Sequence, residues 1–301
     1  MSSAEFEERE FETALYQQLR VGNNQVWSPG QVLENSVGFD YSAFCVDSYF
    51  WAIHGLQVPY DGIFLDEQLY RRQLHRRRIN RPLPNFSLNL FIQAKRPEIK
   101  KTIPKVLKNQ SLTLPYWRFK LDPAQQQTLQ ALAAETSGKC LVCYAAPAFD
   151  RLSQLYAHTR AGTIVAHTSF PDASWLSGHT AWNYDRPGAV GVANTDPVRI
   201  ERPSLIERIN EIVTQNAEYS NDGFDVQLGR LAEMVISRAE HESEVASLGR
   251  SSLFFQRVGE IDFVLEAYRV PRYDRAVRNF LIVLAFVDTY RLQWFVLGKA
   301  T

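Results

Sequence analysis

Two polar side chains, Gln93 and Lys95, end an apolar run in the segment Asn89 to Pro97, NLFIQAKRP. An apolar run of this length that ends in polar residues is typical of a buried strand whose carboxyl end opens into a site. Because alternate residues of a strand face the same side, Gln93 and Lys95 point together while Ala94 points the other way. A carbonyl oxygen and an ammonium group are costly to bury there unless they hold something. We infer that they hold a metal ion and a phosphate.

A helix that could bring a carboxylate to this strand is predicted from Ala4 to Arg20. Apolar residues that include Phe11 and Leu15 recur there with helical spacing, and they form a single stripe. Glu8 and Glu12 fall on or beside that stripe, unlike the other early glutamates, which suit a solvated face. Both therefore remain candidates for an acidic group in the site.

A second acidic group lies in a predicted strand from Val37 to Phe44, VGFDYSAF. Asp40 sits in the middle of this strand, between alternating apolar residues. Such an aspartate either faces solvent on an exposed sheet or serves as a ligand in a site, and the strand pattern alone fits both interpretations.

Basic residues concentrate between Tyr70 and Arg81, YRRQLHRRRINR, although the whole chain has 33 basic and 33 acidic residues. The candidate nucleic-acid-binding residues in this segment are Arg71, Arg72, Arg76, Arg77 and Arg78. A solvated surface is one explanation; the other is contact with phosphates, whose oxygens match the arginine fork. The position just before the NLFIQAKRP strand favours phosphate contact.

The 301 residues, 45% of them hydrophobic, suggest two domains. Strands and helices alternate between residues 123 and 167, which favours a sheet covered by helices, with GTIVAH at 162–167 as a strand. The first of these helices is predicted from Pro123 to Glu135, with Asp122 as its N-cap and Pro123 at its first position. Residues 168–203 are rich in glycine and proline and are predicted to be loops; His179 there is a candidate for substrate contact. Beyond a boundary near residue 202 only helical spacing occurs, and a last helix is predicted from Asp274 to Gly298.

The expected location is the cytoplasm. The first residues, MSSAEFEERE, lack the basic and apolar parts of a signal peptide, and the longest apolar run, Phe280 to Val287, is too short to span a bilayer. The odd number of cysteines, 3, favours a reducing compartment. Cys140 and Cys143 form a C-x-x-C on a predicted strand, so they should face opposite sides as buried thiols.

Taken in order, three of these features resemble the PD-(D/E)XK nuclease superfamily. They are Phe11-Glu12 in a helix, Gly38-Phe39-Asp40 in a strand, and Gln93-Ala94-Lys95-Arg96 at the end of a later strand. The pattern is most similar to the Mrr-type restriction endonucleases, in which glutamine replaces a second acid. The resemblance covers residues from about Glu8 to Arg96, and it implies an α/β fold with a central mixed sheet flanked by helices, assigned to residues 1–202 with an arginine-rich insertion near 70–82. The helical spacing predicts an all-helical region in 203–301.

The same resemblance implies a metal-dependent nuclease that cleaves phosphodiester bonds of DNA with Mg²⁺ or Mn²⁺, in restriction or anti-phage defence. Asp40 would be the main metal ligand, joined by the side-chain oxygen of Gln93 and the backbone carbonyl of Ala94. Since glutamine carries no charge, a helix carboxylate must add to the site, and Glu12 is preferred over Glu8 because it follows Phe11.

Lys95 would orient the attacking water and stabilise the charge on the phosphate, and Arg96 with the arginine run would hold the nucleic-acid backbone. The expected partner is nucleic acid rather than a membrane; a homo-oligomer or a partner protein of a defence system is left open. Two other interpretations remain: a nucleic-acid-binding protein that has lost cleavage, and an interaction protein that acts through its helical C-terminal region.

Overall fold

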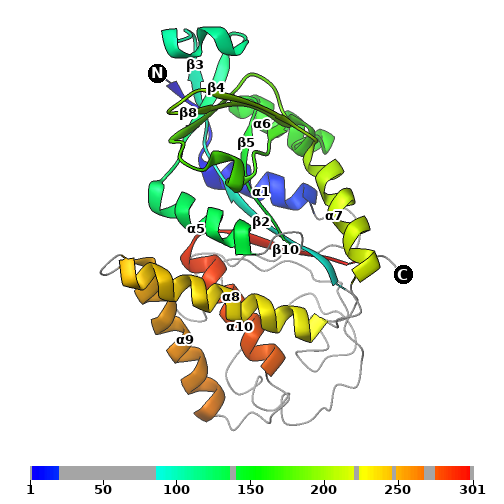
Figure 1. The fold of residues 1–301 in the computed structure, drawn as a ribbon. Coiled ribbons are helices and arrows are strands. Elements are labelled where there is room, and N and C mark those ends of the chain that lie inside the picture. Colours follow the sequence, from blue (N-terminus) through cyan, green and yellow to red (C-terminus); the bar gives the residue numbers. More distant parts are fainter. Residues whose placement is uncertain are drawn as a thin grey trace.

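The computed structural model of the chain describes residues 2–19, 86–135, 140–219, 224–245, 249–267 and 275–298. Asp40, its predicted strand at 37–44 and the arginines Arg71, Arg72, Arg76, Arg77 and Arg78 lie outside these residues. The described residues form two β-sheets and several helices (Figure 1). The predicted α/β class, with helices in the C-terminal part, is therefore confirmed.

A mixed four-stranded sheet lies at the centre, with the strand order β10-β2-β5-β6. Its strands are β2 (Phe86–Ala94), β5 (Cys140–Pro147), β6 (Thr168–Ser169) and β10 (Gln293–Gly298). Strand β2 runs parallel to β5 and antiparallel to β10, so it has a paired neighbour on each edge. The predicted strand that ends in the site is thus an inner strand of this sheet.

A six-stranded antiparallel sheet has the order β1-β3-β4-β7-β8-β9. Its strands are β1 (Ser2–Ser3), β3 (Glu98–Lys100), β4 (Tyr116–Lys120), β7 (Ala181–Tyr184), β8 (Ala189–Asn194) and β9 (Val198–Arg202). The prediction that 168–203 is mainly loop is wrong. Its glycines serve the sheet instead: Gly188 has φ +92° in the turn before β8, and Gly191 lets Trp182 pack against the backbone.

The helices are α1 (Glu8–Leu19), α5 (Pro123–Glu135), α6 (Leu152–Ala161), α7 (Leu205–Tyr219), α8 (Phe224–Val245), α9 (Arg250–Ala267) and α10 (Arg275–Thr289). Short 3-10 turns are η1 (Lys105–Gln110), η2 (Val165–His167) and η3 (Ala173–Leu176). Helix α5 starts as predicted, because Asp122 Oδ1 accepts a hydrogen bond from the Gln125 backbone N–H at 2.8 Å. The strand predicted at 162–167 is wrong, since Gly162 ends α6 with φ +64° and η2 follows.

The two faces of β2 and β5 are buried in different cores. Leu90 and Ile92 pack with Phe11 and Leu15 of α1 and with residues of α6 and α7. Phe91 packs on the opposite face with α5, α8 and α10. Figure 1 shows α8, α9 and α10 together on one side of the four-stranded sheet. Burial on both faces explains why the sequence of β2 is apolar without alternation.

The C-terminal part of the chain is not helical throughout. Helix α10 ends at Thr289, and the segment predicted as its continuation forms β10, which pairs with β2 in the register Gln293↔Ile92. Aromatic and branched side chains in QWFVLG favour a strand, and Trp294 Nε1 donates a 2.7 Å hydrogen bond to Asn89 Oδ1. Contacts between β2 and α8–α10 thus cross the predicted boundary near residue 202.

None of the described helices is both long and apolar enough to cross a membrane.

Candidate functional site

The carboxyl end of β2 presents Gln93 and Lys95 toward α5. Gln93 lies beside Tyr144 of β5 in the parallel register and is only 3% exposed. The Lys95 backbone N–H continues the sheet by donating to the Ala145 carbonyl at 2.8 Å. Both side chains therefore share the face of Phe91 and Tyr144, as predicted, whereas Ala94 packs in the opposite core with α1.

Gln125 of α5 joins these two side chains. The Lys95 ammonium donates to Gln125 Oε1 at 2.7 Å, and Gln125 Nε2 donates to Gln93 Oε1 at 2.6 Å. The same Nε2 lies 3.3 Å from the Tyr290 carbonyl oxygen at the end of α10. Gln125 is 4% exposed, so this network replaces water for a partly buried ammonium and a buried amide.

Sequence reasoning missed Gln125, although a signal was present. Gln125 lies four residues before Leu129 and seven before Leu132, which both belong to the buried stripe of α5. A glutamine at such a position is on the core-facing side of the helix. A polar residue there needs a buried partner, and that need could have pointed to the polar end of β2.

Burial lowers the pKa of Lys95 below its ordinary value. The negative charge of Glu8 works against this effect, as do the charges of Asp122 and Glu12, whereas the positive charge of Arg250 adds to it. The ammonium also lies 5.7 Å from the centroid of the Tyr144 ring. Its hydrogen-bond partner, Gln125, is neutral, so this hydrogen bond does not neutralise the charge of the ammonium group.

Glu12 of α1 is the second ionisable group with an unusual environment. Burial and, to a smaller extent, repulsion by Glu8 raise its pKa to about 7 against the opposing charges of Arg9, Lys95 and Arg291. Glu8 has a different task, because its Oε2 accepts the backbone N–H of Arg96 at 3.1 Å. The two candidate helix carboxylates thus both lie near the end of β2, and Glu12 is the one poised to exchange a proton near neutral pH.

Arg96 is held by the N-terminal segment. Its Nη1 donates hydrogen bonds to both carboxylate oxygens of Glu7 at 2.9 and 3.0 Å, and its Nη2 donates one to the Ala4 carbonyl at 2.6 Å. Since two of its three nitrogens are occupied, Arg96 anchors the segment before α1 to the end of β2. The prediction that it binds nucleic acid requires these contacts to open.

The described part of the chain therefore brings together four of the predicted residues: Gln93, Lys95, Glu12 and Glu8. Asp40 lies outside it. Strand β5 pairs with β2 from Asn89 to Ala94, and β10 pairs with it from Phe86 to Ile92. Both edges of β2 are therefore paired from Asn89 to Ile92.

The described residues do not by themselves fit a divalent metal ion. No three His, Cys, Asp or Glu side chains among them gather closely enough to hold one. Moreover, Gln93 Oε1 accepts a hydrogen bond from Gln125, and the Ala94 carbonyl accepts one from Gln93 Nε2 at 3.0 Å. Each of the two oxygens that were predicted as ligands thus already accepts one hydrogen bond, and a metal site at this place requires a further carboxylate, such as Asp40.

His179, the other candidate for substrate contact, lies between η3 and β7, and its backbone N–H donates to the Leu176 carbonyl at 3.1 Å. Its Nδ1 is buried without a hydrogen-bond partner in the described residues. None of its contacts joins it to the end of β2. Cys140 is half-buried against one core and Cys143 is buried in the opposite core, so the two face opposite sides as their spacing predicted.

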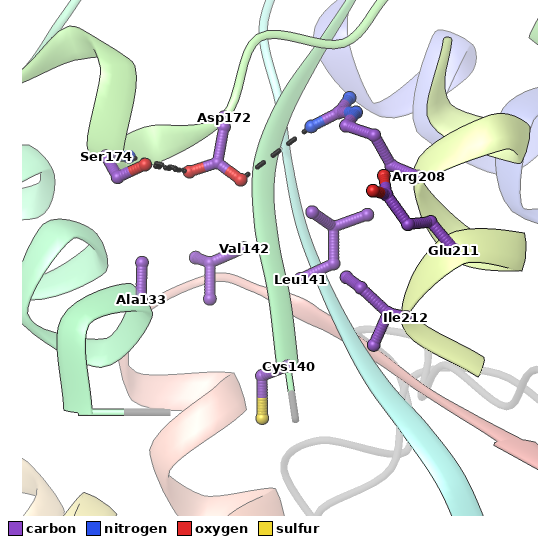
Figure 2. Close-up of a pocket in the computed structure, with 9 residues that line it drawn as sticks. All are labelled: Ala133, Cys140, Leu141, Val142, Asp172, Ser174, Arg208, Glu211 and Ile212. Carbon is purple, nitrogen blue, oxygen red and sulfur yellow. Dashed lines mark hydrogen bonds and ion pairs between the residues drawn. The ribbon is translucent and has the colours of Figure 1, made fainter. Parts of the chain in front are cut away.

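A pocket of about 260 Å³ lies elsewhere, beside the start of β5 (Figure 2). It is lined by Ala133, Cys140, Leu141, Val142, Asp172, Ser174, Arg208, Glu211 and Ile212. The Arg208 guanidinium is fixed by the Phe170 carbonyl at 2.6 Å, by the Trp175 ring at 4.7 Å and by Asp172 at 3.7 Å. None of the predicted site residues in the described part of the chain lines this pocket.

Comparisons with known proteins do not assign a function to the site. No family model matches the chain, and neither the curated proteins nor the solved structures contain a match.

Proposed function

We propose that this protein is a metal-dependent nuclease that hydrolyses phosphodiester bonds of DNA in the cytoplasm, as part of restriction or anti-phage defence. The observation that supports this proposal most directly is the Lys95–Gln125–Gln93 network at the carboxyl end of β2, with Glu12 close by. The order of these residues in the chain adds the resemblance to Mrr-type endonucleases.

In this proposal Lys95 stabilises the negative charge that develops on the phosphate during attack by water. Gln125 fixes the direction of the ammonium group, and the Tyr144 ring shields one side of it from solvent. Glu12, with a pKa of about 7, exchanges a proton with water at neutral pH. Mg²⁺ or Mn²⁺, held mainly by Asp40, would supply Lewis-acid activation of the phosphate.

The test is a plasmid-nicking assay with purified protein and Mg²⁺ or Mn²⁺. We expect Lys95→Ala and Asp40→Ala each to lower the rate by at least about a hundredfold, since each removes a charge that acts in the transition state. Lys101→Ala is the matched control, because Lys101 is exposed and lies six residues away. Unchanged cleavage by both Lys95→Ala and Asp40→Ala would disprove this active site.

A second candidate is a nucleic-acid-binding protein that does not cleave. It is favoured by one observation: the oxygens of Gln93 and Ala94 are used in hydrogen bonds within the protein. This alternative predicts DNA binding that does not depend on Mg²⁺ and no nicking by the unaltered chain with either metal.

A further inference from the structure

The C-terminal helices bring two arginines to the region of Lys95. Arg250 is the first residue of α9, and Arg291 lies between α10 and β10. Neither residue was a candidate in the sequence, because both lie in the part predicted to be a separate helical domain. Their position follows from contacts that cross the predicted boundary.

The backbone places Arg291 at the end of β2. The preceding residue, Tyr290, lies with its carbonyl oxygen 3.3 Å from Gln125 Nε2, in the network that holds Lys95. Two residues after Arg291, Gln293 pairs with Ile92 of β2. Arg291 itself lies in the turn that joins α10 to β10, where the Leu292 backbone N–H donates to the Val287 carbonyl at 2.8 Å. Arg291 has φ +55° and an exposed side chain, and its positive charge reaches Glu12.

Arg250 approaches the site from α9. Its charge is felt by Lys95, and its NH1 is buried without a hydrogen-bond partner in the described residues. The next residue, Ser251, is 1% exposed, so the first turn of α9 is packed into the molecule rather than free. A buried guanidinium nitrogen without a hydrogen-bond partner lowers the stability of the fold, and an added acceptor would remove this cost.

The charges near Lys95 leave room for an added anion. Two of the three nearby carboxylates are already used within the protein, because Asp122 caps α5 and Glu8 accepts the Arg96 backbone N–H. Among the described residues, neither Arg250 nor Arg291 forms a salt bridge. Lys95 itself bonds to a neutral amide. The charge of Arg250 acts on Lys95 and that of Arg291 acts on Glu12, so three cationic groups that no carboxylate of the described residues bonds lie around this end of β2.

We propose that Arg250 and Arg291 bind the phosphates of the nucleic-acid strand at Lys95, so that the C-terminal helices form one wall of the substrate site. The inference rests on the proposed function for its substrate. Guanidinium groups suit this role because they bind two phosphate oxygens at once. Arg250 and Arg291 would thus contact the phosphate backbone of the nucleic acid, and this contact would not depend on the base sequence.

The experiment measures binding of a fluorescein-labelled DNA duplex by anisotropy, with Ca²⁺ in place of Mg²⁺, over salt concentrations from about 50 to 200 mM. We expect the Arg250→Ala/Arg291→Ala double variant to bind about tenfold more weakly or worse. The slope of log affinity against log salt should fall by about 2, near 0.9 for each lost phosphate contact. Arg275→Ala, an exposed arginine at the start of α10, is the control and should match the unaltered chain.

The inference is overturned if the double variant keeps the affinity and the salt slope of the unaltered chain, or if the unaltered chain does not bind the duplex. If the double variant does not fold, the measurement is made on Arg291→Ala alone, because Arg291 is exposed. This single variant should lower the slope of log affinity against log salt by about 1. DNA binding that depends on the arginines, without any nicking, would refute the nuclease and leave the inference standing. Nicking that depends on Lys95 but not on either arginine would refute the inference and leave the proposed nuclease standing.

Discussion

Replacing Glu12 by glutamine should stabilise the fold, and the gain should depend on pH. The fold favours the protonated carboxyl, since burial and Glu8 raise its pKa from 4.5 to about 7. A group of this kind does not lower the free energy of unfolding at a pH below the pKa that it has in the unfolded chain. The loss of free energy grows as the pH rises from that value, and it is complete above the folded pKa. At about 1.4 kcal/mol per pKa unit the full cost is about 3 kcal/mol, an upper value because Glu12 keeps some contact with water.

The assay is urea unfolding of the unaltered chain and of Glu12→Gln in buffer with EDTA, at about pH 5 and about pH 8. We expect Glu12→Gln to be more stable by up to about 3 kcal/mol at the higher pH and by about 1 kcal/mol at the lower one. The control is Glu233→Gln on α8, an exposed glutamate whose replacement should change stability little at either pH. Equal gains for Glu12→Gln at both pH values would refute the raised pKa and the place of Glu12 in the site.

Two further substitutions test the packing around the site, each with a control on a helix of the same molecule. Gln125→Ala leaves the Lys95 ammonium and the Gln93 amide without their shared partner, and should lower the free energy of unfolding by about 2 kcal/mol or more. The exposed Gln127→Ala should stay within about 0.5 kcal/mol; equal losses for the two variants in urea unfolding would contradict the network. Gly191→Ala places a methyl group 2.4 Å from a Trp182 ring carbon and 2.6 Å from the Asn183 carbonyl oxygen. It should cost about 1–3 kcal/mol in thermal or urea unfolding, whereas Gly259→Ala in α9 meets nothing within 4 Å and should be neutral or stabilising.

Local signals in the sequence were enough to predict the elements that carry the site. The apolar run before Gln93 predicted β2, the stripe through Phe11 predicted α1, and Asp122-Pro123 predicted the start of α5. Each of these depends on periodicity or capping within one segment, which is where sequence patterns are most informative. The alternation of a strand also placed Gln93 and Lys95 on one face correctly.

Features that depend on distant contacts were not predictable in this way. Strands β7, β8 and β9 were missed because they are short and lie among glycines and prolines that were interpreted as loop signals. Strand β10 was missed because its apolar residues were interpreted as a continuation of the helix, past the polar residues Asp288 and Arg291. Gln125 was missed because its role appears only when α5 packs on β2, and a single polar residue has no period.

The pairing of β10 with β2 has a consequence for how the protein is made. A ribosome that has completed β2 must still add about two hundred residues before β10 can pair with it. The hydrogen bond between the side chains of Asn89 and Trp294 joins residues that are 205 positions apart. Until then one edge of β2 is open to any other strand, including that of a second nascent chain. Arg291 and the Tyr290 carbonyl also arrive only with that last segment. Translation thus sets the order of events, and the segment that carries Arg291 is made about two hundred residues after β2.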